Sequence, residues 1–304
     1  MTRVAAVDCG TNSIRLLVLE RDAEGRTVEL DRRLELVRLG QGVDATGEFH
    51  PDALERTFGA VDRFAAVMQE LGVERVRFVA TSAARDARNR ELFFEGIKSR
   101  VGVLPEVISG DEEARLSFAG ALAGVEPSTG PVLVVDCGGG STELVQGGTD
   151  ADVQHSTSLD IGSVRLRERF LHDDPPTPDQ IAAARAHVDG LLDASGIDFD
   201  AIRSFIGVAG TATSLSAITQ GLGEYQRELV HRSQLSREQL SSAADWLLST
   251  PWRQVEAETC LPAKRAEVSC AGALIVASVA QRVQPAMVVS ESDILDALAV
   301  GLLA

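Results

Sequence analysis

Apolar residues form short blocks along the chain, and these blocks alternate with longer amphipathic segments. Residues 4–7 form an apolar block of strand length, residues 76–80 form a second one interrupted only by Arg77, and a polar turn follows each of them. Residues 51–71 instead carry apolar side chains at helical spacing. Because strands and helices alternate in this way, the pattern predicts an α/β protein.

The remaining segments continue this alternation. Thr177 and Ser236 each stand three residues before a Gln, which predicts two helix N-termini closed by capping boxes. Pro178 fits the first position of the earlier helix. The other predicted elements are an extended stretch at 27–37, a buried strand at 204–208, and helices at 88–101, 112–123, 237–248, 268–280 and 293–303.

The segment around Asp8 is repeated 128 residues later in the chain. Val-Asp-Cys-Gly-Thr-Asn-Ser-Ile-Arg-Leu at 7–16 aligns with Val-Asp-Cys-Gly-Gly-Gly-Ser-Thr-Glu-Leu at 135–144. Each copy places a polar turn between two apolar strands, which predicts a β-hairpin. Glycine permits the backbone conformations in which consecutive N–H groups of a turn bind an anion. We therefore expect two related lobes that face one cleft, with a boundary in the turn-rich segment 125–130.

The composition and net charge of the chain argue against several classes of function. The chain has 304 residues and a net charge of −16, which disfavours binding to nucleic acid, and its few aromatic residues disfavour a stacking platform. Its uncharged stretches are too short to cross a membrane, and its N-terminus does not resemble a leader. The four cysteines lack metal-ligand spacing and are expected to be buried, reduced thiols of a cytoplasmic protein.

The repeated hairpins place carboxylates beside both turns. If the turns face a shared cleft, Asp8 and Asp136 lie at its two walls, and Glu143 lies on the return strand of the second hairpin. Carboxylates beside a phosphate-binding turn are typical of a Mg²⁺ site, because Mg²⁺ prefers oxygen ligands. The alternative is that each Asp only caps its own turn.

Two further segments have candidate phosphate-binding residues. Residues 81–89 follow a strand with hydroxyl side chains and then Arg85 and Arg88, which suits phosphate recognition, although a solvated helix start has the same composition. The glycine-containing turn at 207–211 opens a helix and could bind another phosphate, or it could serve packing alone.

Adjacent acids at Glu112 and Glu113 begin a predicted helix. Acidic residues are common in a first helical turn because they complement the helix dipole. Adjacent carboxylates also raise one another's pKa, which suits a general base that activates water. Both interpretations remain open from the residues alone.

These motifs, in this order, resemble the exopolyphosphatase / guanosine pentaphosphate phosphatase family of the actin–Hsp70–sugar kinase superfamily. The resemblance covers essentially the whole chain: the two Asp-Cys-Gly turns, 81–85, 109–115, 207–211 and 265–273. It implies an α/β fold with two ribonuclease-H-like domains, 1–125 and 126–304, flanking an active-site cleft. It also implies Mg²⁺-dependent release of terminal phosphate from polyphosphate or pppGpp, with Mn²⁺ as an alternative metal, and a cytoplasmic homodimer.

The resemblance also assigns roles to individual residues. It implies that Glu113 is the general base that activates water. It implies a metal site formed by Asp8, Asp136 and Glu143. The phosphate contacts that it implies are Asn12, Ser13, Arg85, Gly139, Gly140, Ser141, Gly210 and Thr211, to which we add Arg15 and Gly138 from the two hairpins.

The chain departs from some relatives in length. It has no C-terminal helical extension of the kind thought to grip long polymers, and its acidic charge points the same way, so short-chain polyphosphate is the expected substrate. A pppGpp phosphohydrolase shares every motif and remains an alternative. The same fold is also compatible with a non-catalytic sensor of alarmone or polyphosphate, and with an ATP-dependent kinase or chaperone of the superfamily.

Overall fold

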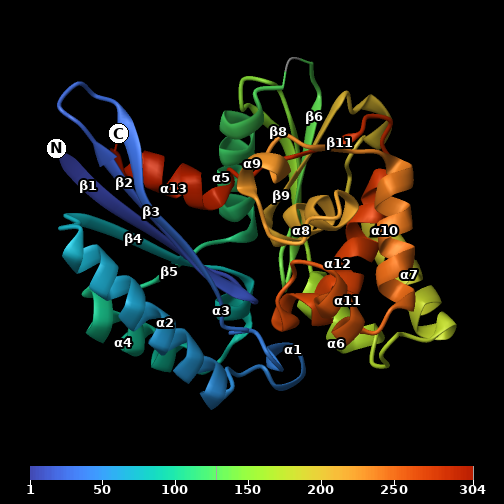
Figure 1. Cartoon of the computed structure of the whole chain (residues 1–304), viewed down its shortest axis with the longest axis horizontal. Coiled ribbons are helices and arrows are strands. Elements are labelled where there is room, and N and C mark those ends of the chain that lie inside the picture. The colour runs from blue at the N-terminus through green and yellow to red at the C-terminus, as the bar shows by residue number, and fades with distance from the viewer. Residues whose placement is uncertain (128, 304) are drawn as a thin grey trace. The chain divides into compact units, whose positions relative to one another are not determined.

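The computed structural model describes residues 1–127 and 129–303 (Figure 1). The chain divides into two compact units. One contains Met1–Leu116 and the segment from Ile294 on, and the other contains Ser117–Asp293. Ser128, which is part of the predicted boundary segment, lies outside the described residues, as does Ala304. The predicted domains 1–125 and 126–304 stay a prediction.

The first unit is built on a five-stranded sheet in the order β3-β2-β1-β4-β5. The first three strands form an antiparallel meander, and β4 and β5 continue the sheet parallel to β1. Both predicted strands, at 4–7 and 76–80, are confirmed. The strands are β1 (Thr2–Cys9), β2 (Ser13–Arg21), β3 (Thr27–Leu36), β4 (Arg75–Ala80) and β5 (Glu106–Val107).

Helices cover both faces of this sheet, which explains why β1 is apolar without alternation. Ala5 and Val7 pack with helices α2 (Pro51–Glu70) and α4 (Arg90–Val101), whereas Val4 and Ala6 pack with α13 (Ile294–Leu303). Figure 1 shows α2 and α4 on one face and α13 on the other. The shorter helices are α1 (Val43–Thr46) and α3 (Ser82–Asp86), and α5 (Gly110–Val125) crosses the boundary between the units.

The second unit contains a six-stranded sheet in the order β10-β11-β9-β6-β7-β8. Its antiparallel meander β6-β7-β8 and the parallel neighbour β9 match the arrangement of β1-β2-β3 and β4 in the first unit. The predicted repeat is therefore a repeat of topology. The strands are β6 (Val132–Cys137), β7 (Thr142–Gly147), β8 (Val153–Leu159), β9 (Ser204–Val208), β10 (Gln234–Leu235) and β11 (Met287–Val289).

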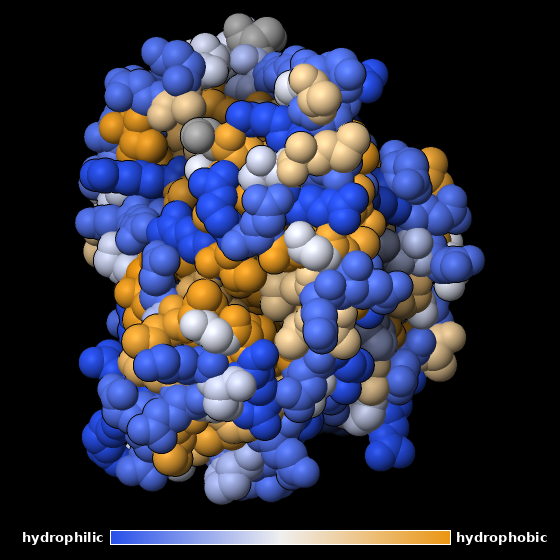
Figure 2. All heavy atoms as spheres, turned by 90° about the vertical axis from the view of Figure 1, so that its left-hand side faces the viewer, coloured by the Kyte–Doolittle hydropathy of each residue, from blue (hydrophilic) through white to orange (hydrophobic). Residues whose placement is uncertain are grey.

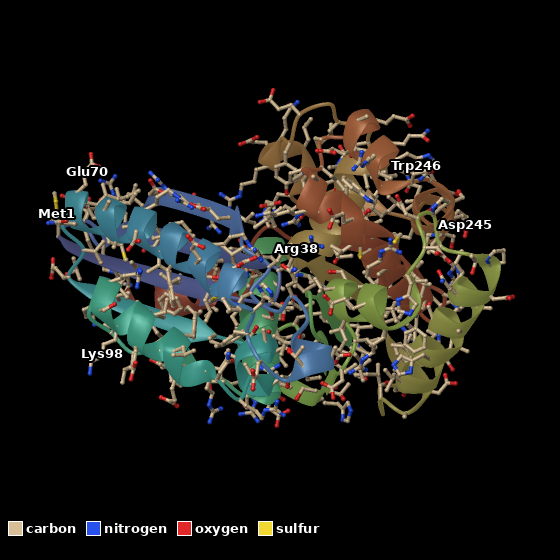
Figure 3. The ribbon with its side chains drawn as sticks, turned by 90° about the horizontal axis from the view of Figure 1, so that it is seen from below. Met1, Arg38, Glu70, Lys98, Asp245 and Trp246 are labelled. Carbon is tan, nitrogen blue, oxygen red and sulfur yellow. The ribbon has the colours of Figure 1, made fainter. Side chains whose placement is uncertain are left out.

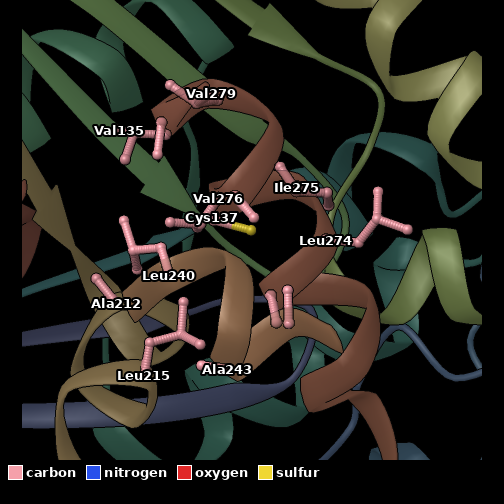
Figure 4. Close-up of a cluster of buried hydrophobic side chains, with 14 of the residues drawn as sticks. Val135, Cys137, Ala212, Leu215, Leu240, Ala243, Leu274, Ile275, Val276 and Val279 are labelled. Atoms are coloured by element: carbon pink, nitrogen blue, oxygen red, sulfur yellow. The ribbon is translucent and has the colours of Figure 1, made fainter. Parts of the chain in front are cut away.

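Helix α12 (Ala263–Ala280) forms the centre of the second unit's core. Its Leu274, Ile275 and Val276 are fully buried, and they belong to the same cluster as Val135 and Leu240 (Figure 4). The predicted capping boxes at Thr177 and Ser236 are confirmed. The other helices are α6 (Ser163–Phe170), α7 (Pro178–Asp193), α8 (Ala209–Thr219), α9 (Arg227–Val230), α10 (Arg237–Ser249), α11 (Trp252–Glu258) and a 3₁₀ turn at Phe199–Ala201.

Large apolar side chains are exposed at several places on the surface, among them Leu92 and Leu104. Edge strand β3 exposes Val28 and Leu34 but also carries charged residues, which protect an edge from pairing with another chain. Figure 2 shows hydrophilic side chains over much of one face, with apolar side chains between them. In the described parts of the chain, no helix combines the length and apolar composition that crossing a bilayer requires.

Candidate active site

Asp136 and Glu143 lie directly opposite each other on neighbouring strands β6 and β7. Residues opposed in an antiparallel pair present their side chains on the same face of the sheet. Both are buried, with Asp136 7% and Glu143 1% exposed. The strand pairing therefore places two carboxylates side by side at the end of the second hairpin, where the predicted metal site lies.

Hydroxyl groups from two other elements bind these carboxylates. Ser117 on α5 donates a hydrogen bond to Asp136 Oδ2, and Ser158 on β8 donates one to Glu143 Oε1 at 2.7 Å. Neither serine was among the predicted site residues. For Ser117 the sequence held one signal, since it stands four residues after Glu113, one helical turn further along the predicted helix.

The donor set at this position fits Mg²⁺. Mg²⁺ usually takes one or two protein carboxylates and completes its shell with water and substrate phosphate oxygens. Asp136 and Glu143 supply two such carboxylates without softer ligands. Among the residues that the structure describes, no group of three or more His, Cys, Asp or Glu side chains forms a larger metal cage.

The glycine turn between β6 and β7 is held from behind by helix α6. The Gly138 N–H group donates to Ser141 O at 3.1 Å and closes the turn. The carbonyl of Gly139 accepts from the N–H groups of Val164 and Arg165 at 2.9 and 3.1 Å, and that of Gly138 accepts from Ser163 at 2.9 Å. Since these carbonyls bind α6, we expect the amide groups of the turn, including Gly140, to be its phosphate-binding atoms.

Gly162 makes this support possible. A Cβ atom at Gly162 would lie 2.4 Å from the backbone carbon of Gly139 and 2.6 Å from the nitrogen of Gly140. Only a residue without a side chain allows the start of α6 to approach the turn so closely. The sequence did not reveal this, because the contact joins two segments that are distant along the chain.

The first hairpin has the same strand pairing as the second, but different side chains occupy the equivalent positions. Asp8 pairs with Arg15 at the register position that Asp136 and Glu143 share in the second hairpin. The Arg15 guanidinium donates to Asp8 Oδ2 from Nη2 at 2.6 Å and from Nε at 3.1 Å. The first hairpin therefore pairs a carboxylate with a guanidinium group, whereas the second hairpin places two carboxyl groups opposite each other.

The first turn also has polar atoms that suit a ligand. The Gly10 N–H group donates to Ser13 O at 2.9 Å, which closes this turn as Gly138 closes the second. Within the described residues, Thr11 Oγ1 and Asn12 Oδ1 are buried and have no hydrogen-bond partner. Buried polar atoms of this kind usually have a ligand or water to bind, so the prediction for Asn12 gains support.

The segment after β3 packs on this first turn. The N–H group of Arg38 donates to Asn12 O and that of Gly40 donates to Thr11 O, each at 2.9 Å. A Cβ atom at Gly40 would lie 2.2 Å from the Thr11 side chain. Figure 3 shows Arg38 at the far end of the meander from Met1. The turn is therefore fixed by a neighbouring loop, as the second turn is fixed by α6.

Glu113 is buried in the first turn of α5 and forms an ion pair with Arg85. Arg85 Nη1 donates to Glu113 Oε2 at 2.8 Å and to the carbonyl of Ile108 at 3.0 Å. Its neighbour Glu112 binds Arg77 instead, at 3.0 Å. The two acids therefore face different guanidinium groups, and the case for Glu113 as a base rests on its place beside Arg85 rather than on repulsion from Glu112.

The predicted turn at 207–211 combines packing with a nearby cation. Gly207 is a packing position, since a Cβ atom there would lie 2.4 Å from the sulfur of Met287. At Gly210 a Cβ atom would lie 1.9 Å from Arg265 Nη1, so the guanidinium lies directly against this glycine. Thr211 Oγ1 donates to the carbonyl of Cys137 at 2.8 Å, which ties the start of α8 to the end of β6.

The thiols beside the two turns are not candidate nucleophiles. Cys9 and Cys137 are buried and reduced, as predicted. Burial raises the pKa of the Cys137 thiol to about 12, and burial together with the charge of Asp8 raises the pKa of Cys9. Both groups therefore stay protonated at neutral pH, whereas thiol chemistry requires the thiolate.

The chain is similar to known phosphatases. The chain matches the Ppx/GppA phosphatase family over residues 18–293. It is 42% identical to Exopolyphosphatase 2 of Mycobacterium tuberculosis, over 99% of both chains. It is 32% identical to the guanosine-5'-triphosphate,3'-diphosphate pyrophosphatase of Photobacterium profundum, over 77% of this chain and 47% of that one.

A solved structure shares the complete fold. The crystal structure of an exopolyphosphatase-like protein superposes with a TM-score of 0.94 at 40% identity, covering 100% of this chain and 99% of that one. The expected fold class, α/β with two domains of the actin–Hsp70–sugar kinase type, is confirmed.

Proposed function

Because the chain belongs to the Ppx/GppA phosphatase family, we propose that it is an exopolyphosphatase that hydrolyses the terminal phosphate of inorganic polyphosphate in a Mg²⁺-dependent reaction. The observation that carries this proposal is the pair of adjacent buried carboxylates, Asp136 and Glu143, beside a glycine turn. Such a pair would hold a divalent cation next to amide groups that bind phosphate oxygens.

In this proposal, each predicted residue binds either the metal or the phosphate groups. Asp136 and Glu143 hold the metal, and Asp8 is the weaker candidate because its carboxylate already binds Arg15. When bound, Mg²⁺ neutralises charge on the phosphate oxygens and orients the terminal group. The proposed phosphate contacts are Asn12, Ser13, Arg85, Gly138, Gly139, Gly140, Ser141, Gly210 and Thr211, with Arg15 acting through Asp8.

Glu113 is the proposed general base. A water molecule attacks the terminal phosphorus, its proton passes to the Glu113 carboxylate, and the phosphoanhydride bond to the next phosphate breaks. The products are orthophosphate and a chain shortened by one unit. Positioning and charge neutralisation supply most of the acceleration in reactions of this type. Arg85 suits both tasks, because it binds Glu113 and carries the guanidinium group that matches phosphate geometry.

Phosphate release from short-chain polyphosphate with Mg²⁺, with and without EDTA, tests the proposal. We expect release that stops when EDTA removes the metal. A folded protein that binds polyphosphate without releasing phosphate would overturn the proposal in favour of a sensor. The net charge of −16 supports short chains, because a long polyanion requires an extended basic surface.

A second candidate substrate is pppGpp, because a relative that covers 77% of this chain is named for that activity. Both reactions remove a terminal phosphate, so the same residues would serve. Comparison of kcat/KM for the two substrates at equal Mg²⁺ concentration separates them. A higher value for pppGpp would reassign the physiological reaction and leave the chemistry unchanged.

The proposal also includes a cytoplasmic homodimer, as the family resemblance implies. It includes no nucleic-acid or membrane partner, because of the acidic charge and the short uncharged stretches of the sequence. The sequence offers two apolar helices for a dimer interface, those predicted at 268–280 and 293–303. Both α12 and α13 pack into the cores of their own units, and α13 also exposes Val300. Size-exclusion chromatography with light scattering tests the dimer.

A further inference from the structure

Two serines, the buried Ser117 and the exposed Ser158, bind the proposed metal carboxylates, and the mechanism above gives them no role. Ser117 Oγ donates to Asp136 Oδ2, and Ser158 Oγ donates to Glu143 Oε1 at 2.7 Å. They come from different elements, α5 and β8. Each of the two carboxylates is therefore held by a hydroxyl group from outside its own strand.

Ser117 stands where a helix would ordinarily favour an apolar residue. Its side chain is fully buried, and apart from Glu113 its buried neighbours on α5 are non-polar, among them Ala114, Phe118 and Ala121. Alanine would fit a buried helical position better than serine, because serine has a lower helix propensity and needs a hydrogen-bond partner when it is buried. The hydrogen bond to Asp136 supplies that partner.

We propose that Ser117 is a positioning residue that fixes the orientation of Asp136 for metal binding, and that Ser158 does the same for Glu143. A hydrogen bond from a fixed donor holds a carboxylate in one rotamer, so less ordering is needed when the metal binds. This inference rests on the proposed function, since it requires that Asp136 and Glu143 bind a divalent cation.

Because Ser117 lies on helix α5, this helix has a second proposed role. Glu113, the proposed base, lies four residues before Ser117, one turn earlier on the same helix. The helix that carries the base therefore also positions a metal carboxylate. A change at Ser117 acts on Asp136 through one hydrogen bond and leaves Glu113 in place.

Metal affinity measured without substrate tests this inference directly. Binding of Mn²⁺ is followed by electron paramagnetic resonance of the free ion, with folding checked by circular dichroism. We expect Ser117→Ala and Ser158→Ala each to weaken Mn²⁺ binding by about 10- to 100-fold, the range for loss of a partner that orients a metal ligand. Ser117→Thr keeps a hydroxyl group and should recover much of the affinity.

Two control variants make the result specific. Ser195→Ala removes a buried hydroxyl of the same unit that donates to the carbonyl of Leu192 at 2.7 Å, and it should leave Mn²⁺ affinity unchanged. Asp136→Asn should abolish binding at this site. If Ser117→Ala does not fold, Ser158→Ala and Ser117→Thr carry the test.

The outcomes separate this inference from the proposed function. Wild-type protein that binds Mn²⁺ through Asp136, with unchanged affinity in Ser117→Ala and Ser158→Ala, would overturn the positioning role and leave the phosphatase intact. Wild-type protein that binds no Mn²⁺ and releases phosphate in EDTA would overturn the metal site itself.

Discussion

The guanidinium of Arg15 binds the carboxylate of Asp8 at 2.6 Å, at the strand register where the second hairpin places Glu143 beside Asp136. The same duplicated scaffold thus carries a neutral ion pair in one unit and two carboxylates in the other. Two neighbouring carboxylates suit a divalent cation, which prefers oxygen ligands. Metal dependence is therefore expected to reside in the second unit.

Substitutions at the two aspartates should differ in their effect on metal use. Asp136→Asn removes a proposed ligand and should lower kcat by about 10²–10³-fold, as loss of a group that stabilises developing charge does. Asp8→Asn should have a smaller effect, and the Mg²⁺ concentration for half-maximal activity should change little. Phosphate release across a Mg²⁺ titration checks both. Equal loss of metal activation in Asp8→Asn would contradict the assignment.

Arg85 should contribute to substrate affinity and to the orientation of Glu113. Hydrogen bonds to charged groups contribute about 1.5–3 kcal/mol, so Arg85→Ala should lower kcat/KM by roughly 10- to 100-fold. Arg85→Lys keeps the charge but not the planar fork and should recover only part. Arg88, whose side chain is 72% exposed three residues later, supplies the control. The role would be excluded if Arg88→Ala reduced kcat/KM as much as Arg85→Ala.

Gly162→Ala should impair activity more than it impairs folding. The added methyl group would enter the backbone of Gly139 and Gly140, so the phosphate-binding turn must shift. Gly190→Ala is the matched control, because its Cβ would meet no atom within 4 Å inside helix α7. The control should stabilise the protein by about 0.4–1 kcal/mol. Urea unfolding and phosphate release measure the two effects, and full activity in Gly162→Ala would show that the turn tolerates displacement.

Stability should decrease in mild acid through His187. Burial, with the charge of Arg169, lowers the pKa of His187 below its usual 6.5. The unfolded chain therefore binds this proton more readily than the folded protein does, and the free energy of unfolding decreases as pH falls below 6.5. His187→Phe keeps the ring that stacks on Phe170 and should flatten this pH dependence. An unchanged profile in His187→Phe would assign the acid sensitivity to other groups.

Local patterns were sufficient to predict most of the elements. The hairpins, the capping boxes at Thr177 and Ser236, and the helix after Pro51 depend on interactions between near neighbours, and the structure confirms them. The structure also shows what near neighbours do not encode. Helix α13 packs against β1, nearly the whole chain away, because the second face of that sheet needs a cover.

In the candidate site, too, some residues could be predicted from the local sequence and others could not. The repeat identified Asp8, Asp136 and the turn residues, because these lie in the two hairpins themselves. The partners that distinguish the two hairpins depend on tertiary contacts, as in the hydrogen bonds from Ser117 and Ser158. The separate ion pairs of Glu112 and Glu113 also depend on the sheet that supplies Arg77. Glu112 and Glu113 are therefore neighbours in the sequence, but their carboxylates pair with different arginines.

The identity of the general base is tested most directly by a matched pair of glutamine variants. Glu113→Gln and Glu112→Gln make the same chemical change at neighbouring positions on α5, and phosphate release from short-chain polyphosphate with saturating Mg²⁺ gives kcat for each. We expect Glu113→Gln to lower kcat by roughly 10²–10⁴-fold, the range for loss of a general base. Glu112→Gln should remain close to wild type. Near-normal turnover in folded Glu113→Gln would contradict the mechanism.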